Sequence, residues 1–145
     1  MISSFVLSAV LMYKADHSKR EALLEETSQA AALISLEPFI RLSGTNEDLS
    51  TPAYLSLKEM LTELKKQNEK YHFVYALGAR DNGEIYLYAD SEPLGSAEES
   101  LPGEVYAEAT EALHSLFDTG IGFVEGPFTD RWGTFVSGVV PIFDP

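Results

Sequence analysis

The chain has 145 residues, of which 45% are hydrophobic and 23% charged, so it suits one globular domain better than a disordered or fibrous segment. Ten Lys and Arg residues against 23 Asp and Glu residues give a net charge of −13, a field that repels a nucleic-acid backbone. The absence of cysteine from the sequence excludes disulfides, thiolate nucleophiles and cysteine-based metal sites. The three His residues form no zinc motif, so we expect neither a metal nor another cofactor.

An uncharged and mostly apolar stretch occupies residues 2–13. It is shorter than the roughly 20 residues that span a bilayer, and it lacks the basic start of a signal peptide. We interpret residues 1–13 as the end of a transmembrane helix; the alternative is a buried or amphipathic first helix of a soluble domain. Helical periodicity continues from Tyr13 to Leu36, which predicts one long N-terminal helix that ends before Pro38.

Two further elements follow a loop. Thr51 as an N-cap and Pro52 at the first helical position predict a second helix that runs to about Asn68. A period of two over residues 71–77 and 84–90 predicts a β-hairpin, because the turn-forming residues Arg-Asp-Asn-Gly separate the two runs.

The second half of the chain predicts a third helix at residues 103–117 and strands at residues 122–128 and 134–143. The resulting order of elements is typical of an α+β domain, in which helices cover a mainly antiparallel sheet. Residues 142–145 look like the start of a turn with no strand after it, so we also expect that a final strand is missing.

The two faces of the predicted hairpin differ in chemistry. One face is small and aliphatic, which suits packing against the long helix. The other combines tyrosines with a carboxylate at the strand end, residue types that orient a small ligand. The alternative is that the tyrosines are half-exposed packing residues and that Asp90 only opens a loop. Symmetrical pairing about the turn, which sets Tyr75 opposite Tyr88, gives this aromatic face the residues Phe73, Tyr75, Leu77, Tyr86, Tyr88 and Asp90.

The run GPFTDRWGTFVS at residues 126–137 resembles the extracytoplasmic PAS-like sensor domains, of the Cache or PDC type, of bacterial and archaeal membrane signalling proteins. Stretches such as residues 42–45, 90–93 and 102–106 agree, and the resemblance extends from about residue 20 to the end of the sequence. It implies a central antiparallel sheet with the long N-terminal helix packed on one face and a ligand cavity, covered by a helix and loops, on the other. It also implies flanking membrane helices and a following histidine kinase or diguanylate cyclase domain, which this sequence does not contain.

The same resemblance implies a cavity beneath residues 41–68 and 91–106. Asp90 would pair with an amine ligand, whereas Arg131 or Lys58 would serve a carboxylate ligand. Two alternatives stay open, because Arg131 could form a turn-fixing ion pair with Asp130 and Trp132 could belong to the core. The candidate ligand-binding residues are Tyr75, Tyr88, Asp90, Ser91, Tyr106, Arg131 and Trp132, and no catalytic residue is expected.

We therefore expect an extracytoplasmic, non-enzymatic sensor domain that binds a small solute, is attached to the cell membrane through its flanking helices and forms a homodimer through the first helix. Ligand binding would shift that helix and regulate an output domain. One alternative is a protein-docking or spacer module, whose interior would be filled. Another is a hydrolase that uses Asp90 with Glu92 or Glu125, although the sequence supplies no nucleophile triad.

Overall fold

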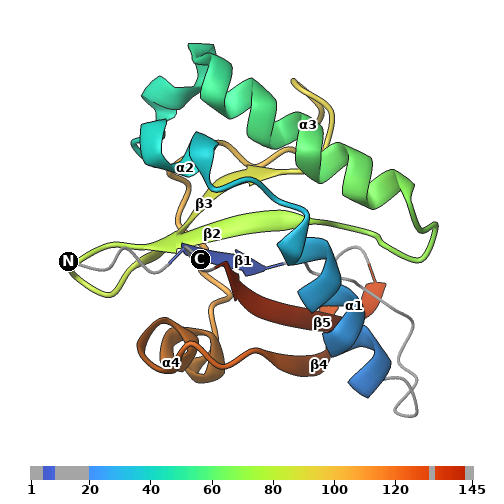
Figure 1. Ribbon diagram of the computed structural model, residues 1–145. Helices are drawn as coiled ribbons and strands as arrows, with labels where there is room; N and C mark the ends of the chain where they lie inside the picture. Colours follow the sequence, from blue (N-terminus) through green and yellow to red (C-terminus); the bar gives the residue numbers. More distant parts are fainter. Residues whose placement is uncertain (1–4, 9–19, 131–132, 143–145) are drawn as a thin grey trace.

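The structure is a computed structural model that describes residues 5–8, 20–130 and 133–142. Its centre is a five-stranded antiparallel sheet in the order β3-β2-β1-β5-β4 (Figure 1). The predicted α+β class with an antiparallel sheet is therefore confirmed. The strands are β1 (Phe5–Ser8), β2 (Tyr75–Ala79), β3 (Ile85–Asp90), β4 (Phe123–Asp130) and β5 (Gly133–Ile142).

Strand β1 comes first in the chain but lies in the middle of the sheet. Val6 pairs with Leu77 of β2 on one side and with Pro141 of β5 on the other. The prediction of one helix from the first residues to Leu36 is therefore wrong, because the backbone of this segment pairs with two strands. The interpretation of residues 1–13 as the end of a membrane helix is wrong for residues 5–8, which form β1, and its other residues lie outside the described ranges.

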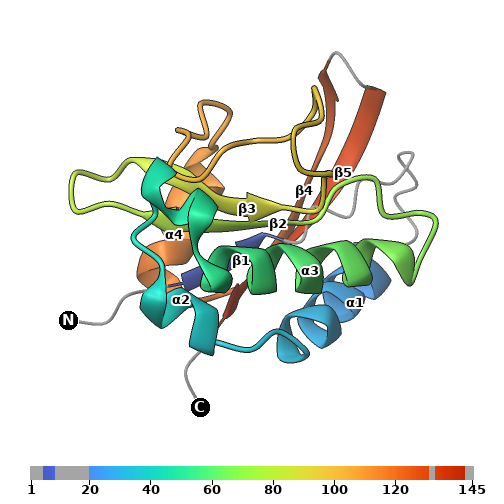
Figure 2. The same ribbon diagram turned by 90° about the horizontal axis from the view of Figure 1, so that it is seen from above.

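Helices cover the sheet on both faces (Figure 2). One face carries α1 (Arg20–Ala32), α2 (Glu37–Arg41) and α3 (Pro52–Lys66), together with the short 3-10 helix η2 (Asn46–Ser50). Of the described residues, α4 (Glu111–Thr119) and the long loop that follows β3 cover the opposite face. We call these the three-helix face and the α4 face.

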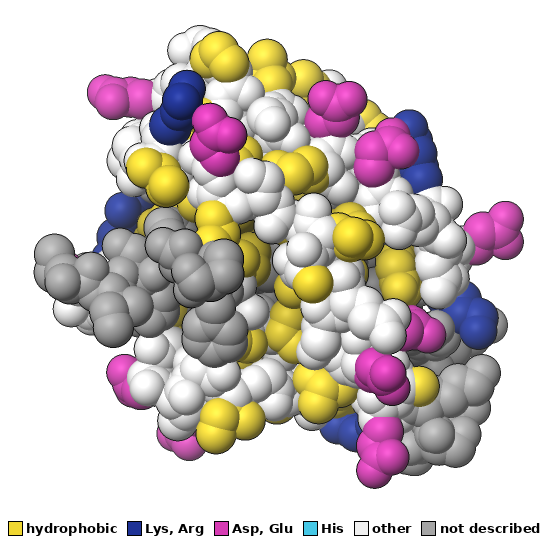
Figure 3. Space-filling model, viewed as in Figure 1, with side chains coloured by type: hydrophobic (Ala, Val, Ile, Leu, Met, Phe, Trp, Pro, Cys, Tyr) yellow, Lys and Arg dark blue, Asp and Glu magenta, His cyan; other side chains and the backbone are white. Residues whose placement is uncertain are grey.

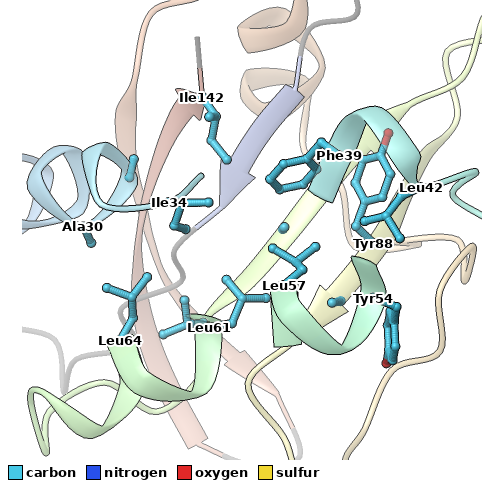
Figure 4. Packing of buried hydrophobic residues seen from close by; sticks show 14 of the residues in the cluster. Ala30, Ile34, Phe39, Leu42, Tyr54, Leu57, Leu61, Leu64, Tyr88 and Ile142 are labelled. Atoms are coloured by element: carbon cyan, nitrogen blue, oxygen red, sulfur yellow. The ribbon is translucent and has the colours of Figure 1, made fainter. Parts of the chain in front are cut away.

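Helix α3 forms for the reasons that the sequence indicated. The Thr51 hydroxyl accepts a hydrogen bond from the Tyr54 amide at 3.2 Å, and Pro52 occupies the first turn, where its missing N–H costs nothing. Its apolar side packs toward α1, α2 and the sheet (Figure 4), whereas Leu55 is exposed. The α3 side chains in this core are Tyr54, Leu57, Leu61 and Leu64.

Helix α4 is shorter than predicted and begins at Glu111 rather than near residue 103. The reason lies in the preceding segment, whose backbone bonds to strand β3: the Leu87 amide donates to the Glu104 carbonyl at 2.9 Å, and the Tyr106 amide to the Ile85 carbonyl at 2.8 Å. A backbone committed to a strand edge cannot also make helical bonds, so the helix starts only after Thr110.

The β2–β3 hairpin forms as predicted, but in a different register. Its connection covers residues 80–84, one residue more than predicted, and the Arg80 amide bonds to the Glu84 carbonyl at 2.9 Å. Tyr86 consequently lies opposite Gly78 rather than Leu77, and a bulge between Ala76 and Leu77 shifts the pairing again. A one-residue shift of one strand relative to its partner turns the side chains of that strand to the other face. The predicted set of aromatic side chains is therefore divided between the two faces.

Candidate functional site

A cavity of about 580 Å³ lies on the α4 face of the sheet. Strands β2 and β3 form its floor together with β4 and β5, and the loop that leads from β3 to α4 forms its wall. Because α4 begins so late, this region is covered by a loop rather than by a packed helix. The cavity is lined by Phe73, Tyr75, Leu87, Asp90, Ala97, Glu98, Glu99, Ser100, Glu104, Val105, Tyr106, Glu108, Thr110, Glu125, Phe128, Thr129, Phe135 and Ser137.

Five aromatic side chains line this cavity. Tyr75 of β2 and Tyr106 of the covering loop bring their hydroxyl oxygens to 3.0 Å of each other, and their ring centroids lie 5.7 Å apart. This contact links the floor of the cavity to its wall. Such rings offer apolar area and π faces to a ligand. The other three aromatic lining residues are Phe73, Phe128 and Phe135.

Glu125 is the half-buried carboxylate that β4 contributes to the cavity. The Thr110 hydroxyl donates to its Oε2 at 2.6 Å, and the same hydroxyl accepts from the Leu113 amide as the N-cap of α4. Burial raises the pKa of the Glu125 carboxyl above its usual range, and the Thr110 hydrogen bond offsets only part of that effect.

A cluster of buried charges stands at the inner end of the cavity. Lys58, which reaches down from α3, places its Nζ 3.1 Å from Asp90 Oδ1 and 2.6 Å from Glu99 Oε2. The exposed fractions of the three side chains are only 7%, 5% and 6%, so water screens their interaction weakly. Asp90 also accepts the backbone amides of Ser100 at 2.7 Å and Glu92 at 3.0 Å.

The cluster holds two carboxylates and one ammonium group, and the pKa values follow from this imbalance. Burial alone lowers the pKa of Lys58, but Glu99 and Asp90 outweigh it and hold that pKa above its ordinary value. Burial raises the pKa of Asp90, because the Ser100 amide and Lys58 compensate its charge only in part. Asp90 therefore braces the loop against α3 and is not a free partner for a ligand amine.

Three of the predicted site residues meet at the cavity. Tyr75, Asp90 and Tyr106 line it, and Tyr75 lies directly opposite Asp90 in the sheet. Of the loop predicted to cover the cavity, residues 91–106, only residues 97–100 and 104–106 line it. The prediction that residues 41–68 cover it is wrong, because η2 and α3 pack on the three-helix face.

Two other predicted residues lie outside the cavity lining. Tyr88 packs in the core of the three-helix face, with its ring centroid 5.3 Å from that of Phe39 in an edge-to-face arrangement (Figure 4). Its hydroxyl accepts from Tyr86 at 2.8 Å, and burial raises its pKa strongly. Ser91 is buried, and its hydroxyl accepts the Val74 amide at 3.1 Å, which is a structural role. Arg131 and Trp132 lie outside the described residues.

The sequence analysis did not predict Glu125, Phe128 and Phe135 as lining residues of a cavity. Glu125 was considered only for a catalytic pair. The available signal was the run FVEGPF of β4, where a Glu in an otherwise apolar strand needs a partner or a solvent-filled space. Phe128 lies at the rim of the cavity and is 50% exposed. No pattern in the sequence indicates that this large apolar side chain is exposed.

Comparisons of this chain with family models, with curated proteins and with solved structures find no match. The described residues contain no helix long and apolar enough to cross a bilayer. Within residues 5–8, 20–130 and 133–142, no group of three or more His, Asp or Glu side chains is placed to hold a metal ion.

Proposed function

We propose that this chain is the ligand-binding domain of a membrane receptor, an extracytoplasmic sensor of the PAS-like Cache or PDC type. The observation that carries the proposal is the cavity on the α4 face, with a volume of about 580 Å³ and a lining of aromatic and polar side chains. Both its volume and its lining fall in the range of small-molecule sites. A docking or spacer module would be expected to have a filled interior at this place.

The proposed mechanism is a coupling between the cavity and the three-helix face. Glu99 and Asp90 belong to the cavity lining and also contact Lys58 of α3, so a ligand that moves the loop acts on α3 through this charge cluster. Only the difference in ligand affinity between two states can drive such a shift, and typical couplings are roughly 1–3 kcal/mol. In the receptor, α1 would carry the shift to a dimer partner and to a kinase or cyclase domain.

The hydrolase alternative that pairs Asp90 with Glu92 gains no support from these two carboxylates. Asp90 is bound to Lys58, and Glu92 is bound to Lys65 at 2.7 Å, so each carboxylate is held by a separate ammonium group. Acid–base catalysis needs two carboxylates free to exchange protons at one substrate.

A thermal-shift screen against amino acids, amines, carboxylates, nucleobases and sugars tests the proposal. A ligand at 100 times its Kd stabilises the fold by about 2.7 kcal/mol, which raises Tm by several degrees in a domain of this size. Ser137→Phe, which would fill the cavity, should abolish the shift. Ser56→Phe on the exposed side of α3 is the matched control and should retain it. If no compound shifts the melting of the folded wild-type domain, the sensor proposal fails.

A further inference from the structure

The described lining of the cavity carries charge of one sign. Six carboxylates belong to it, and none of the described lining residues is Lys, Arg or His. On the side of the molecule seen in Figure 3, Asp and Glu side chains are instead scattered singly over the surface. The carboxylates of the cavity are Asp90, Glu98, Glu99, Glu104, Glu108 and Glu125.

The inner carboxylates are only partly neutralised. Asp90 and Glu99 share the single ammonium of Lys58, and Glu125 accepts a hydrogen bond from the neutral hydroxyl of Thr110. Among the described residues no basic side chain lies within ion-pair distance of Glu125. Three carboxyl groups therefore share one ammonium group beside a hollow that a ligand can fill.

The aromatic side chains, like the carboxylates, favour a ligand of positive charge. The face of a Phe or Tyr ring carries negative electrostatic potential and attracts an ammonium group within about 6 Å of its centroid. Phe128 and Phe135 line the cavity along with Glu125, and all three come from the β4–β5 pair. A carboxylate ligand lacks a corresponding partner among the described lining residues, since Lys58 already binds Asp90 and Glu99.

We propose that the cavity binds a small organic cation, a primary or methylated amine, with Glu125 as its charge partner and the aromatic rings as its walls. This inference rests on the proposed sensor function and names the class of its ligand. The exposed carboxylates of Glu98, Glu104 and Glu108 at the rim raise the local concentration of such a cation and speed its entry.

The test compares probes that match in shape and differ in charge. Binding to the purified domain is measured by calorimetry for choline and its neutral carbon isostere 3,3-dimethyl-1-butanol, and for butylamine and butyrate. Each cation is expected to bind at least about tenfold more tightly than its partner, a difference of about 1.4 kcal/mol. Glu125→Gln should weaken cation binding at least about tenfold, and Phe128→Leu, at an exposed position that cannot disturb the core, should weaken it less.

Glu59→Gln is the matched control, because it removes one carboxylate from the exposed side of α3 and leaves the cavity intact. It should change cation affinity by less than about twofold at physiological salt, where long-range fields are screened. Equal or tighter binding of the neutral or anionic probes, or full cation affinity in Glu125→Gln, overturns the inference but leaves the sensor proposal standing. Binding of none of the four probes also overturns it, and the wider screen then decides separately whether the domain has a ligand.

Discussion

Each face of the sheet has a hollow, and the two hollows differ in chemistry. The one on the three-helix face, of about 790 Å³, lies between α1 and β5 and is lined mostly by apolar side chains such as Leu24, Ile34 and Val140, whereas the one on the α4 face is lined by carboxylates and aromatic rings. On the three-helix face, Leu57 and Leu61 of α3 are fully buried and pack against side chains from α1, α2 and the strands. On the α4 face, a helix of nine residues covers only part of the sheet, and its Leu113 and Leu116 fill the space beneath it. The remainder is the cavity, which exists because the covering segment bonds to the edge of β3 instead of packing as a helix.

The two faces also differ in the hydrogen-bond partners of their carboxylates. Asp48, on the three-helix side, accepts the amides of Ser43 at 2.9 Å and Gly44 at 2.8 Å, so its own turn satisfies it. Glu125, on the cavity side, has the hydroxyl of Thr110. A packed region completes its hydrogen bonds internally, whereas a binding region keeps capacity for a partner from outside.

The largest expected effect comes from Lys58, which links α3 to the loop that lines the cavity. Lys58→Met leaves Asp90 and Glu99 buried without a counter-charge, which should lower the free energy of unfolding by about 3–5 kcal/mol at neutral pH. Denaturant unfolding measures this loss. The loss should shrink at acidic pH, because burial raises the pKa of Asp90 and protonation of its carboxyl removes part of the uncompensated charge.

Lys65→Met is the control for that substitution, since Lys65 pairs with Glu92 but its side chain is 32% exposed. Water reaches Lys65 but not Glu92, which is 7% exposed, so the cost should be about 1–3 kcal/mol and smaller than that of Lys58→Met. Equal losses in the two variants would show that the Lys58 cluster does not brace the cavity loop against α3.

A smaller loss of stability, caused by a substitution at Gly78, tests whether Tyr86 and Tyr88 lie on the three-helix face. A Cβ atom added at Gly78 would lie 2.6 Å from atoms of both Tyr86 and Tyr88, so Gly78→Ala should cost about 1–3 kcal/mol through overpacking. Thermal unfolding checks this, with Ala79→Ser at the exposed neighbouring position as a control. A neutral Gly78→Ala would favour the register in which Tyr75 pairs with Tyr88.

The smallest expected effect concerns the pH dependence of Glu125. Because burial raises its pKa above 4.5, the folded state holds this proton more tightly than the unfolded chain does. The contribution of Glu125 to the free energy of unfolding therefore falls as pH rises from its ordinary pKa through its raised pKa, and it stays lower above that point.

Glu125→Gln removes this contribution, so the variant should gain stability relative to wild type at neutral pH, and the gain should vanish at acidic pH. Unfolding free energies of both proteins across this pH range provide the measurement. A constant difference between them at every pH would mean that the Glu125 carboxyl is as well solvated in the fold as in the unfolded chain.

Local signals in the sequence predicted the elements whose causes are themselves local. Thr51 and Pro52 begin α3 at the expected residue, and the turn after Ala79 joins two antiparallel strands as expected. The antiparallel α+β class followed from the order of these elements. Tyr75, Asp90 and Tyr106, which the sequence predicts as ligand contacts, line the cavity.

Interactions between distant residues decided the rest. A hairpin connection one residue longer than predicted moved Tyr88 into the opposite core, and the pairing of residues 103–106 with β3 prevented the first turns of the predicted third helix. The contact of Lys58 with Asp90 spans 32 positions in the sequence, so no local pattern could show that this carboxylate is already occupied. The sequence thus determined which elements and which chemical groups the protein has. The tertiary structure decided which of those groups neutralise one another and which face a cavity, because burial and charge pairing depend on neighbours in space.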